Sequence, residues 1–446
     1  MLASSYTITC FRSSSPFVFV SSSPPAFSRR VLPDASSLNG AWVWGSALAL
    51  FVVAGGTGAF FRFGMVYGWT GGLELEHIRH AHSHLMYFGW GTPALMVLIW
   101  RCLPDDVTAS RERIFRWVVG GVLTAAVLAY PLFLLFGYSP VQMGSARLPI
   151  AVIGASLNIL CWYGFVGLYV TATCSLPRTG ALRLWDVAVG ALVLATLGAW
   201  SLALLPVLGL HNPLIATVLT HVFLDLFSEG WFVLGGLGVA FALLPSNSDG
   251  PASWSVWLVA LGLPFTFLLA LPVSRLPIEL AIAGRAGGAM VGIGLLVMTV
   301  RLMRGLPHGT ARWLWGVPLA FLAVKAGAQL AGSLVPGLWP GASHGLRILY
   351  LHLMLLGFLS PVLVAGAQTV WARNALCDIA IFYGAVGLLL ATLLPLTSWG
   401  FGGVAAYAVA AWGALGPVLA AAWMLSRAGA TARVSTRQEL EALDFP

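Results

Sequence analysis

Long apolar runs, each close to the length of a membrane span, dominate this sequence. A helix needs roughly 20 apolar residues to cross a bilayer, and 9% of the residues here are charged while 59% are hydrophobic. A soluble domain carries about 25% charged residues. The sequence therefore predicts an all-α integral membrane protein, a bundle of about twelve transmembrane helices. The predicted spans are residues 41–61, 80–100, 116–137, 148–172, 185–206, 214–244, 253–272, 277–300, 313–335, 345–368, 377–396 and 401–425.

Turn and charge patterns separate these spans and set the expected domain limits. We expect a membrane domain at residues 39–428 and a cytoplasmic tail at 429–446. Residues 1–38 are rich in Ser, Pro and Arg, with no acid before Asp34. That composition resembles a transit peptide, but no clear amphipathic helix accompanies it. A disordered extension, or a start codon placed too far upstream, is the favoured interpretation.

The distribution of basic residues orients the bundle, because Lys and Arg concentrate in cytoplasmic loops. With the N-terminus inside, sixteen of the 23 basic residues fall on the cytoplasmic side. Five, Arg62 among them, fall on the outer side. Both termini are therefore predicted to be cytoplasmic, in a bacterial inner membrane. The net charge of +8 is explained by these loops, so we expect membrane lipid and no nucleic acid as a partner.

Four of the nine histidines lie within the eight residues HIRHAHSH at 77–84. A histidine entering a bilayer costs free energy and rarely lacks a partner. On a helix, His77, His80 and His84 share one face, whereas His82 points away. His77 and His80 are interpreted as a solvated entry cluster. His82 and His84, followed at once by the apolar run LMYFGWG, are candidate metal ligands.

A polar stripe crosses the predicted span 214–244. His221, Asp225 and Glu229 are spaced i, i+4 and i+8, so they lie on one face of a helix. Neutral imidazole with carboxylate suits iron or copper, and acids can carry protons. His221 and Asp225 are therefore candidate metal ligands, and Asp225 and Glu229 are candidate catalytic acids. The alternative is a stripe that forms hydrogen bonds with a neighbouring helix.

His352 lies early in the span 345–368, enclosed by Leu, Tyr and Met. The three histidine-bearing spans run in the same direction, so their histidines all fall in the outer half of the membrane. Two neutral imidazoles on opposite helices are the usual axial pair of a six-coordinate haem b. His352 with either His82 or His84 is the candidate pair. The chain has no CxxCH sequence, so the haem would be held without covalent attachment.

Four cations complete the candidate residues. Arg79 and Arg347 lie about one turn outside the histidines and could donate charge-assisted hydrogen bonds to haem propionates; the alternative is ordinary anchoring at the membrane interface. Arg285 and Lys325 lie inside predicted spans. Intramembrane cations usually form ion pairs or line a water path.

Twelve spans with histidines on helices two, six and ten resemble the catalytic subunit of the haem–copper oxidase superfamily, which includes the nitric oxide reductases. His82 followed by SHLMYFGWGTPA is similar to that family's helix-two segment, which carries a low-spin haem ligand. The helix-six stripe, followed by Gly-Trp, resembles the reductase pattern in which the histidine and first acid bind non-haem iron. His344 and His352 resemble its helix-ten spacing. The His-Ala-His entry is also similar to NnrS-like haem proteins of nitric-oxide handling, which implies His84 as the ligand.

The sequence departs from the superfamily pattern at three places. The seventh predicted span, SWSVWLVALGLPFTFLLALPV, has no histidine, where the family has two that complete its second metal site. Met354 stands where the family has a second haem ligand, and Asp225 replaces the usual glutamate. We therefore expect a bis-histidine site for at most one haem.

The resemblance implies a membrane haem-binding protein of the oxidoreductase type, with electron transfer and reduction of oxygen or nitric oxide. Its expected cofactors are at least one haem b and a non-haem iron or copper ion. Its expected electron donor is a partner subunit, a cytochrome or a quinol. The alternative is a non-catalytic membrane protein that uses the same histidines as a haem or copper sensor, or as a transporter.

The topology can be tested with reporter fusions. A fusion at Asp34 and a fusion after Pro446 should both report the cytoplasmic side, because the basic loops favour that orientation. A periplasmic signal from either fusion would contradict the orientation and the shared membrane half of the three histidine sites.

Overall fold

The computed structural model describes residues 40–205, 208–210, 212–244, 250–271, 276–335, 338, 344–371, 376–397, 400 and 402–427. The described residues from 40 to 427 form one compact unit. The predicted extension at 1–38 and the predicted tail at 429–446 lie outside the described residues.

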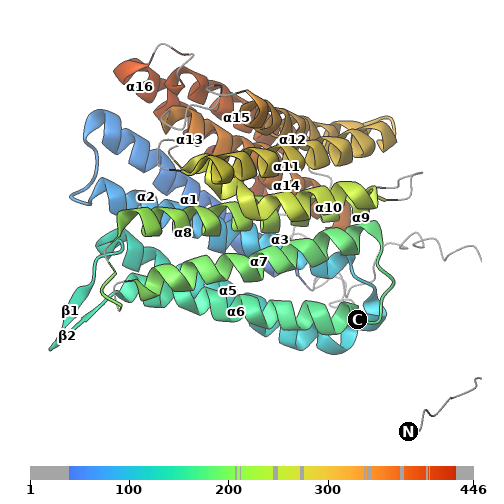
Figure 1. The fold of residues 1–446 in the computed structure, drawn as a ribbon, viewed down its shortest axis with the longest axis horizontal. Helices are drawn as coiled ribbons and strands as arrows, with labels where there is room; N and C mark the ends of the chain where they lie inside the picture. The colour runs from blue at the N-terminus through green and yellow to red at the C-terminus, as the bar shows by residue number, and fades with distance from the viewer. Residues whose placement is uncertain are drawn as a thin grey trace, which may run out of the picture. The chain divides into compact units, whose positions relative to one another are not determined.

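Helices make up nearly all of this unit and lie side by side (Figure 1). Eleven helices among the described residues are long and apolar enough to cross a membrane. A twelfth helical segment, α2–η2–α3, runs without a break from Leu75 to Cys102. The predicted all-α membrane bundle is therefore confirmed.

The elements are α1 (Ala41–Tyr67), α2 (Leu75–His84), η2 (Leu85–Gly91), α3 (Thr92–Cys102), α4 (Asp105–Thr108), η3 (Ala109–Arg111), α5 (Glu112–Phe136), β1 (Val141–Met143), β2 (Ala146–Leu148), α6 (Ile150–Thr173), α7 (Gly180–Leu204), α8 (Pro213–Asp225), η4 (Leu226–Leu234), α9 (Gly235–Leu243), α10 (Ser253–Gly262), η5 (Leu263–Ala270), α11 (Ile278–Gly305), α12 (Thr310–Leu334), α13 (His344–His352), η7 (Leu353–Leu359), α14 (Ser360–Trp371), α15 (Leu376–Leu393), η8 (Leu394–Leu396) and α16 (Gly403–Gly413).

Two features differ from the sequence-based expectation. A short antiparallel hairpin, β1–β2, joins α5 to α6 and projects at the lower left of Figure 1. Its turn contains Gly144 at φ 63°, a conformation that favours glycine. Arg62, predicted in the outer loop after a span that ends at residue 61, lies inside α1, because this helix continues to Tyr67. The predicted end of that span was wrong, and the predicted side of Arg62 stays a prediction.

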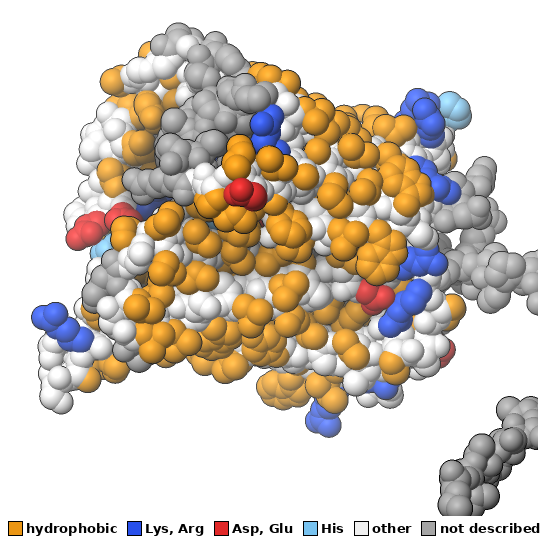
Figure 2. Space-filling view, in the orientation of Figure 1, with side chains coloured by type: hydrophobic (Ala, Val, Ile, Leu, Met, Phe, Trp, Pro, Cys, Tyr) orange, Lys and Arg blue, Asp and Glu red, His pale blue; other side chains and the backbone are white. Residues whose placement is uncertain are grey.

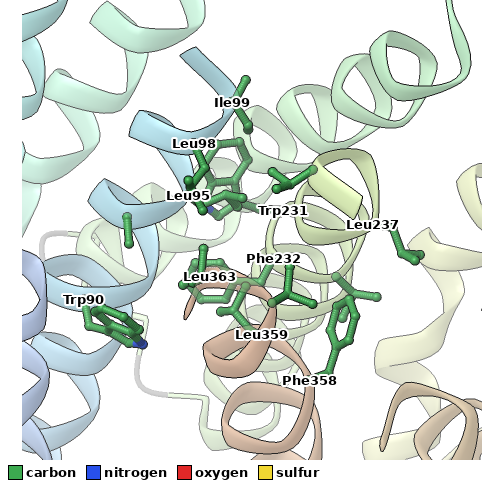
Figure 3. Close-up of a cluster of buried hydrophobic side chains, with 14 of the residues drawn as sticks. Trp90, Leu95, Leu98, Ile99, Trp231, Phe232, Leu237, Phe358, Leu359 and Leu363 are labelled. Atoms are coloured by element: carbon green, nitrogen blue, oxygen red, sulfur yellow. The ribbon is translucent and has the colours of Figure 1, made fainter. Parts of the chain in front are cut away.

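The three histidine-bearing helices form the centre of the bundle. Their second halves, α3, α9 and α14, pack against one another in all three pairs. Figure 3 shows the resulting cluster of buried side chains, with Trp90 and Leu98 from the first helix, Trp231 from the second, and Phe358 and Leu363 from the third. The remaining helices surround this centre and present apolar side chains outward, where Figure 2 shows them spread over the middle of the visible face.

Each central helix contains one π-helical segment, and these three are the π-helices in the described part of the chain. The segments η2, η4 and η7 begin directly after His84, Asp225 and His352. The three share one pattern: a histidine or aspartate, a leucine, a methionine or phenylalanine, two variable residues, a glycine and an aromatic residue. The three heptapeptides are HLMYFGW, DLFSEGW and HLMLLGF. π-Helical turns are rare and frequently mark functional sites.

Side-chain hydrogen bonds connect these central segments. The Tyr87 and Ser228 hydroxyls lie 2.8 Å apart and join η2 to η4. Trp90 Nε1 donates to Ser360 Oγ at 3.0 Å and joins η2 to the start of α14. Thr92 Oγ1 donates to the Tyr87 carbonyl five residues earlier at 2.8 Å, which supports the widened π-turn. All these groups are buried, and such bonds stabilise helix association where lipid offers no hydrogen-bond partner.

The close packing at the centre predicts a strong effect of a single added methyl group. A Cβ at Gly230, the glycine of the η4 heptapeptide, would overlap the Ala191 Cβ on α7. Gly230→Ala should lower the stability of the purified protein by about 1–3 kcal/mol through overpacking, measured by thermal denaturation in detergent. Gly190→Ala is the matched control, because its added Cβ meets nothing within 4 Å. Equal denaturation midpoints for the two variants would contradict this packing.

Candidate functional site

Two histidines have one ring nitrogen fixed by the backbone. His82 Nδ1 lies 2.7 Å from the Ala54 carbonyl oxygen on α1, and His352 Nδ1 lies 2.8 Å from the Ile348 carbonyl oxygen one turn earlier. A carbonyl oxygen accepts hydrogen bonds but cannot donate one, so Nδ1 carries the proton in both rings. Each Nε2 then has a free lone pair. No hydrogen bond joins either Nε2 to another described residue.

Helices α1, α2 and α13 bring these two imidazoles together. His82 packs against Gly58 of α1, where an added Cβ would lie 2.5 Å from His82 Cε1. The two histidines are close enough to interact electrostatically, and Arg62 of α1 interacts with both. Arg62 is a site residue that the sequence analysis missed, because it was placed in a loop.

His84 points the other way, toward α5. Its Nε2 lies 2.7 Å from the Tyr138 hydroxyl, and its ring stacks on Phe133 with the centroids 3.7 Å apart. Burial raises the pKa of Tyr138 to about 12, so the phenol keeps its proton near neutral pH. The geometric expectation that His82 and His84 face different partners is therefore confirmed.

His77 and His80 lie beneath the chain that follows α5, with side chains 14% and 19% exposed. The His80 ring meets the Tyr138 ring edge-on at 4.6 Å, and His77 packs on Gly137. They are thus less solvated than the sequence indicated. His344 begins α13, but its side chain lies outside the described part of the structure.

The two candidate propionate donors lie in different surroundings. Arg79 pairs with Glu76 at 3.0 Å, and both side chains are about half exposed or more. Such surface pairs contribute little to stability, so Arg79 can exchange this partner for another anion. Arg347 is instead part of the wall of a cavity beside α8.

The stripe of His221, Asp225 and Glu229 on α8 and η4 lines this cavity, which has a volume of about 100 Å³. The cavity lies between α8–η4, η5, α12 and α13–η7. Its walls are formed by His221, Leu224, Asp225, Glu229, Thr266, Leu269, Ala270, Gln329, Gly332, Leu346, Arg347, Tyr350, Leu351 and Met354. The three members of the predicted stripe therefore face one space, although Glu229 belongs to the π-helix η4 rather than to a regular α-helix.

Glu229 forms a buried ion pair with Lys325, the chain's only lysine. Lys325 Nζ lies 2.7 Å from Glu229 Oε1 and donates to Gln329 Oε1 at 2.7 Å. Gln329 Nε2 donates to Glu229 Oε2 at 3.1 Å, and the Tyr350 hydroxyl donates to Oε1 at 2.8 Å. Lys325 is fully buried and Glu229 is 5% exposed. Both carboxylate oxygens are thus hydrogen-bonded, as a buried charge requires.

Asp225 lies one turn before Glu229 and has a different environment. Its carboxyl group is beside the Thr266 hydroxyl and within electrostatic reach of Glu229, Lys325 and Arg347. No ion pair joins Asp225 to a basic residue in the described ranges. Asp225 and His221 therefore remain available to bind a metal or a proton, whereas Glu229 is held by Lys325.

The remaining intramembrane cation has a structural role. Arg285 donates from Nε to the Ser333 carbonyl at 2.9 Å and from Nη2 to the Leu334 carbonyl at 3.0 Å. These contacts satisfy carbonyl groups at the end of α12, which lack partners within their own helix.

Metal coordination and relatives add no further assignment. Within the described residues, no group of three or more His, Cys, Asp or Glu side chains is arranged to hold a metal ion. No protein-family model matches the chain, and no curated protein matches it.

The buried pair can be tested by a double-mutant cycle. Lys325→Met leaves Glu229 unpaired at membrane depth and should cost about 3–5 kcal/mol. Lys325→Met combined with Glu229→Met removes both charges, so the thermal denaturation midpoint should recover toward that of the native protein. Arg116→Met removes a half-exposed partner of Glu112, which keeps its pair with Arg101, and should cost less than about 1 kcal/mol. Additive effects of the Lys325 and Glu229 substitutions would contradict the pairing.

Proposed function

We propose that this chain is a membrane haem protein that holds one haem b between His82 and His352 and transfers electrons through it. The proposal rests on one observation, that the two imidazoles make the same kind of hydrogen bond and so have the same tautomer. Each has Nδ1 fixed by a backbone carbonyl and Nε2 free. Histidines that bind metal usually donate their other ring N–H to such an acceptor, which fixes the tautomer and the ring orientation.

Residues around the pair could hold a haem group. The sequence has no CxxCH, so the two imidazoles would hold the haem without covalent attachment. Arg62 interacts with both histidines and could bind a propionate through charge-assisted hydrogen bonds, as could Arg79 or Arg347. A bound haem b would supply one-electron chemistry, while the protein would orient the rings and exclude water.

Reduction of oxygen or nitric oxide would require a second reactive centre, and its candidate ligands are His221 and Asp225, for non-haem iron or copper. Glu229 is a weaker candidate for acid chemistry, because Lys325, Gln329 and Tyr350 occupy its oxygens. Because Glu229 is held by these bonds, electron transfer is favoured over the reduction of oxygen or nitric oxide. It also supports the second candidate function, a non-catalytic haem-binding sensor or transporter.

The membrane, the orientation of the chain in it and the source of electrons are part of the proposal. We place the chain in a bacterial inner membrane with both termini cytoplasmic, on the asymmetry of its basic residues. Figure 2 supports this orientation, because more of the visible Lys and Arg side chains gather at the right-hand end of the bundle. A cytochrome, a quinol or a partner subunit would deliver the electrons.

A reduced-minus-oxidised absorption spectrum of the purified protein tests the haem directly. We expect low-spin haem b bands, and we expect His352→Ala and His82→Ala to abolish them, because loss of one axial imidazole leaves the iron five-coordinate and weakly held. His84→Ala is the matched control and should keep the bands, since His84 faces α5.

Two results would decide against this assignment. Loss of the bands in His84→Ala but not in His82→Ala would transfer the ligand role to His84. Unchanged bands in all three variants would reject the axial pair, and a protein that binds no haem would reject the proposed function.

A further inference from the structure

The two imidazoles proposed as haem ligands are fixed in different ways. His82 Nδ1 donates to the Ala54 carbonyl on α1, a neighbouring helix, and its ring packs on Gly58 of the same helix. His352 Nδ1 donates to the Ile348 carbonyl on its own helix, α13. The His352 ring is therefore fixed relative to α13, and its position in the bundle depends on how α13 itself is held.

Two contacts hold Tyr350, which lies two residues before His352 on α13. Its hydroxyl donates to Glu229 Oε1 at 2.8 Å. Its ring lies beside the Lys325 ammonium, with Nζ 5.3 Å from the ring centroid. A hydrogen bond to a charged group is stronger than a neutral one, and a cation over an aromatic face adds an attraction that increases when both groups are desolvated. Both partners belong to other segments, η4 and α12, so they limit the rotation of α13 relative to its neighbours.

Glu229 and Lys325 are themselves held in place. Lys325 Nζ lies 2.7 Å from Glu229 Oε1, and the Gln329 amide bonds to both side chains. Lys325 is fully buried and Glu229 is nearly so. Separation of the two would leave a charge unpaired in the interior, which is strongly unfavourable. Tyr350 is thus attached to a part of the bundle that resists rearrangement.

Tyr350 and His352 lie on opposite sides of α13. Residues two positions apart point about 200° apart on an α-helix. Tyr350 faces η4 and α12, whereas His352 interacts electrostatically with Arg62 on α1 and His82 on α2. A side-chain tip lies roughly 6 Å from the helix axis, so a rotation of about 10° moves it by about 1 Å. Functional side chains need to be held within about 0.5 Å, so a rotation of this size would disturb the His352 ring.

We propose that Tyr350 is a positioning residue for His352. Through Tyr350, the Glu229–Lys325 pair sets the rotation of α13 and thereby the orientation of the His352 imidazole at the haem. The inference rests on the proposed haem between His82 and His352. It gives the buried pair a role in which the pair neither binds a metal nor exchanges a proton.

Electron paramagnetic resonance of the oxidised full-length protein tests this role, because the largest g value of a bis-imidazole ferric haem depends on the angle between the two imidazole planes. Tyr350→Phe should keep the low-spin haem and shift this g value, since it removes the hydroxyl but keeps the ring beside Lys325. Tyr169→Phe is the matched control. It removes a buried hydroxyl that donates to Asp186 Oδ1 at 2.8 Å between α6 and α7, and it should leave the g value unchanged. An unchanged g value in haem-bound Tyr350→Phe would overturn the inference and leave the proposed function intact.

Gln329→Leu tests whether the buried pair acts through Tyr350. It removes the amide that donates to Glu229 Oε2 and accepts from Lys325, while both charges remain. It should shift the g value in the native background and add little to the shift of Tyr350→Phe, because substitutions that act along one route are not additive. No shift in the native background, or a fully additive one, would overturn the role of the pair.

Hydrogen exchange of the full-length protein in lipid nanodiscs, followed by mass spectrometry, provides a measurement that needs no haem. The backbone amides of residues 348–353 should exchange faster in Tyr350→Phe than in the native protein, because α13 loses a contact that holds it. Their exchange in Tyr169→Phe should match that of the native protein. Equal exchange in Tyr350→Phe and the native protein would overturn the inference whether or not haem is bound. Faster exchange in a protein that binds no haem would reject the proposed function but support Tyr350 as the residue that positions His352.

Discussion

Hydrocarbon offers no hydrogen-bond partner, and this constraint governs the centre of the molecule. Each buried polar group on the three central helices must find a partner inside the protein or bear the full cost of its burial. The central helices form hydrogen bonds with each other in all three pairs. The bonds are Tyr87 with Ser228, Trp90 with Ser360, and Tyr350 with Glu229. Polar contacts thus fix the relative positions of helices whose remaining contacts are apolar.

One helix connects the two candidate sites. On α13, Tyr350 donates to Glu229 at the cavity beside α8, and His352, two residues later, interacts electrostatically with His82 and Arg62. A rotation of α13 would therefore disturb both places at once. The hydrogen bonds around Glu229 and Lys325 hold Tyr350 in place, and through the shared backbone they also limit the freedom of His352.

The sequence predicted the parts of this structure that follow from solvent preference and regular helical geometry. The spans, the shared face of His221, Asp225 and Glu229, and the divergence of His82 from His84 all follow from apolar runs and a rotation of 100° per residue. Partners supplied by distant segments could not be predicted. Lys325 was recognised as an intramembrane cation, but nothing local names Glu229 as its partner, 96 residues away.

The π-helices were missed for a related reason, because the α-helical period was applied throughout. The heptapeptide that accompanies them was present in the sequence three times, and a comparison of the helices with one another would have found it. Arg62 was missed because a charged residue was taken to end an apolar run. In α1 that charge instead interacts with the two histidines inside the bundle.

The repeated heptapeptide has a consequence for how such a protein can change over evolution. The residue at its first position is His84, Asp225 or His352, each placed directly before a π-turn in the same backbone setting. Exchange of one side chain there alters the local chemistry while the leucine, glycine and aromatic residue that shape the turn stay in place. The three central helices thus provide three equivalent backbone positions, and the side chain at each can be exchanged without a change in the residues that shape the turn.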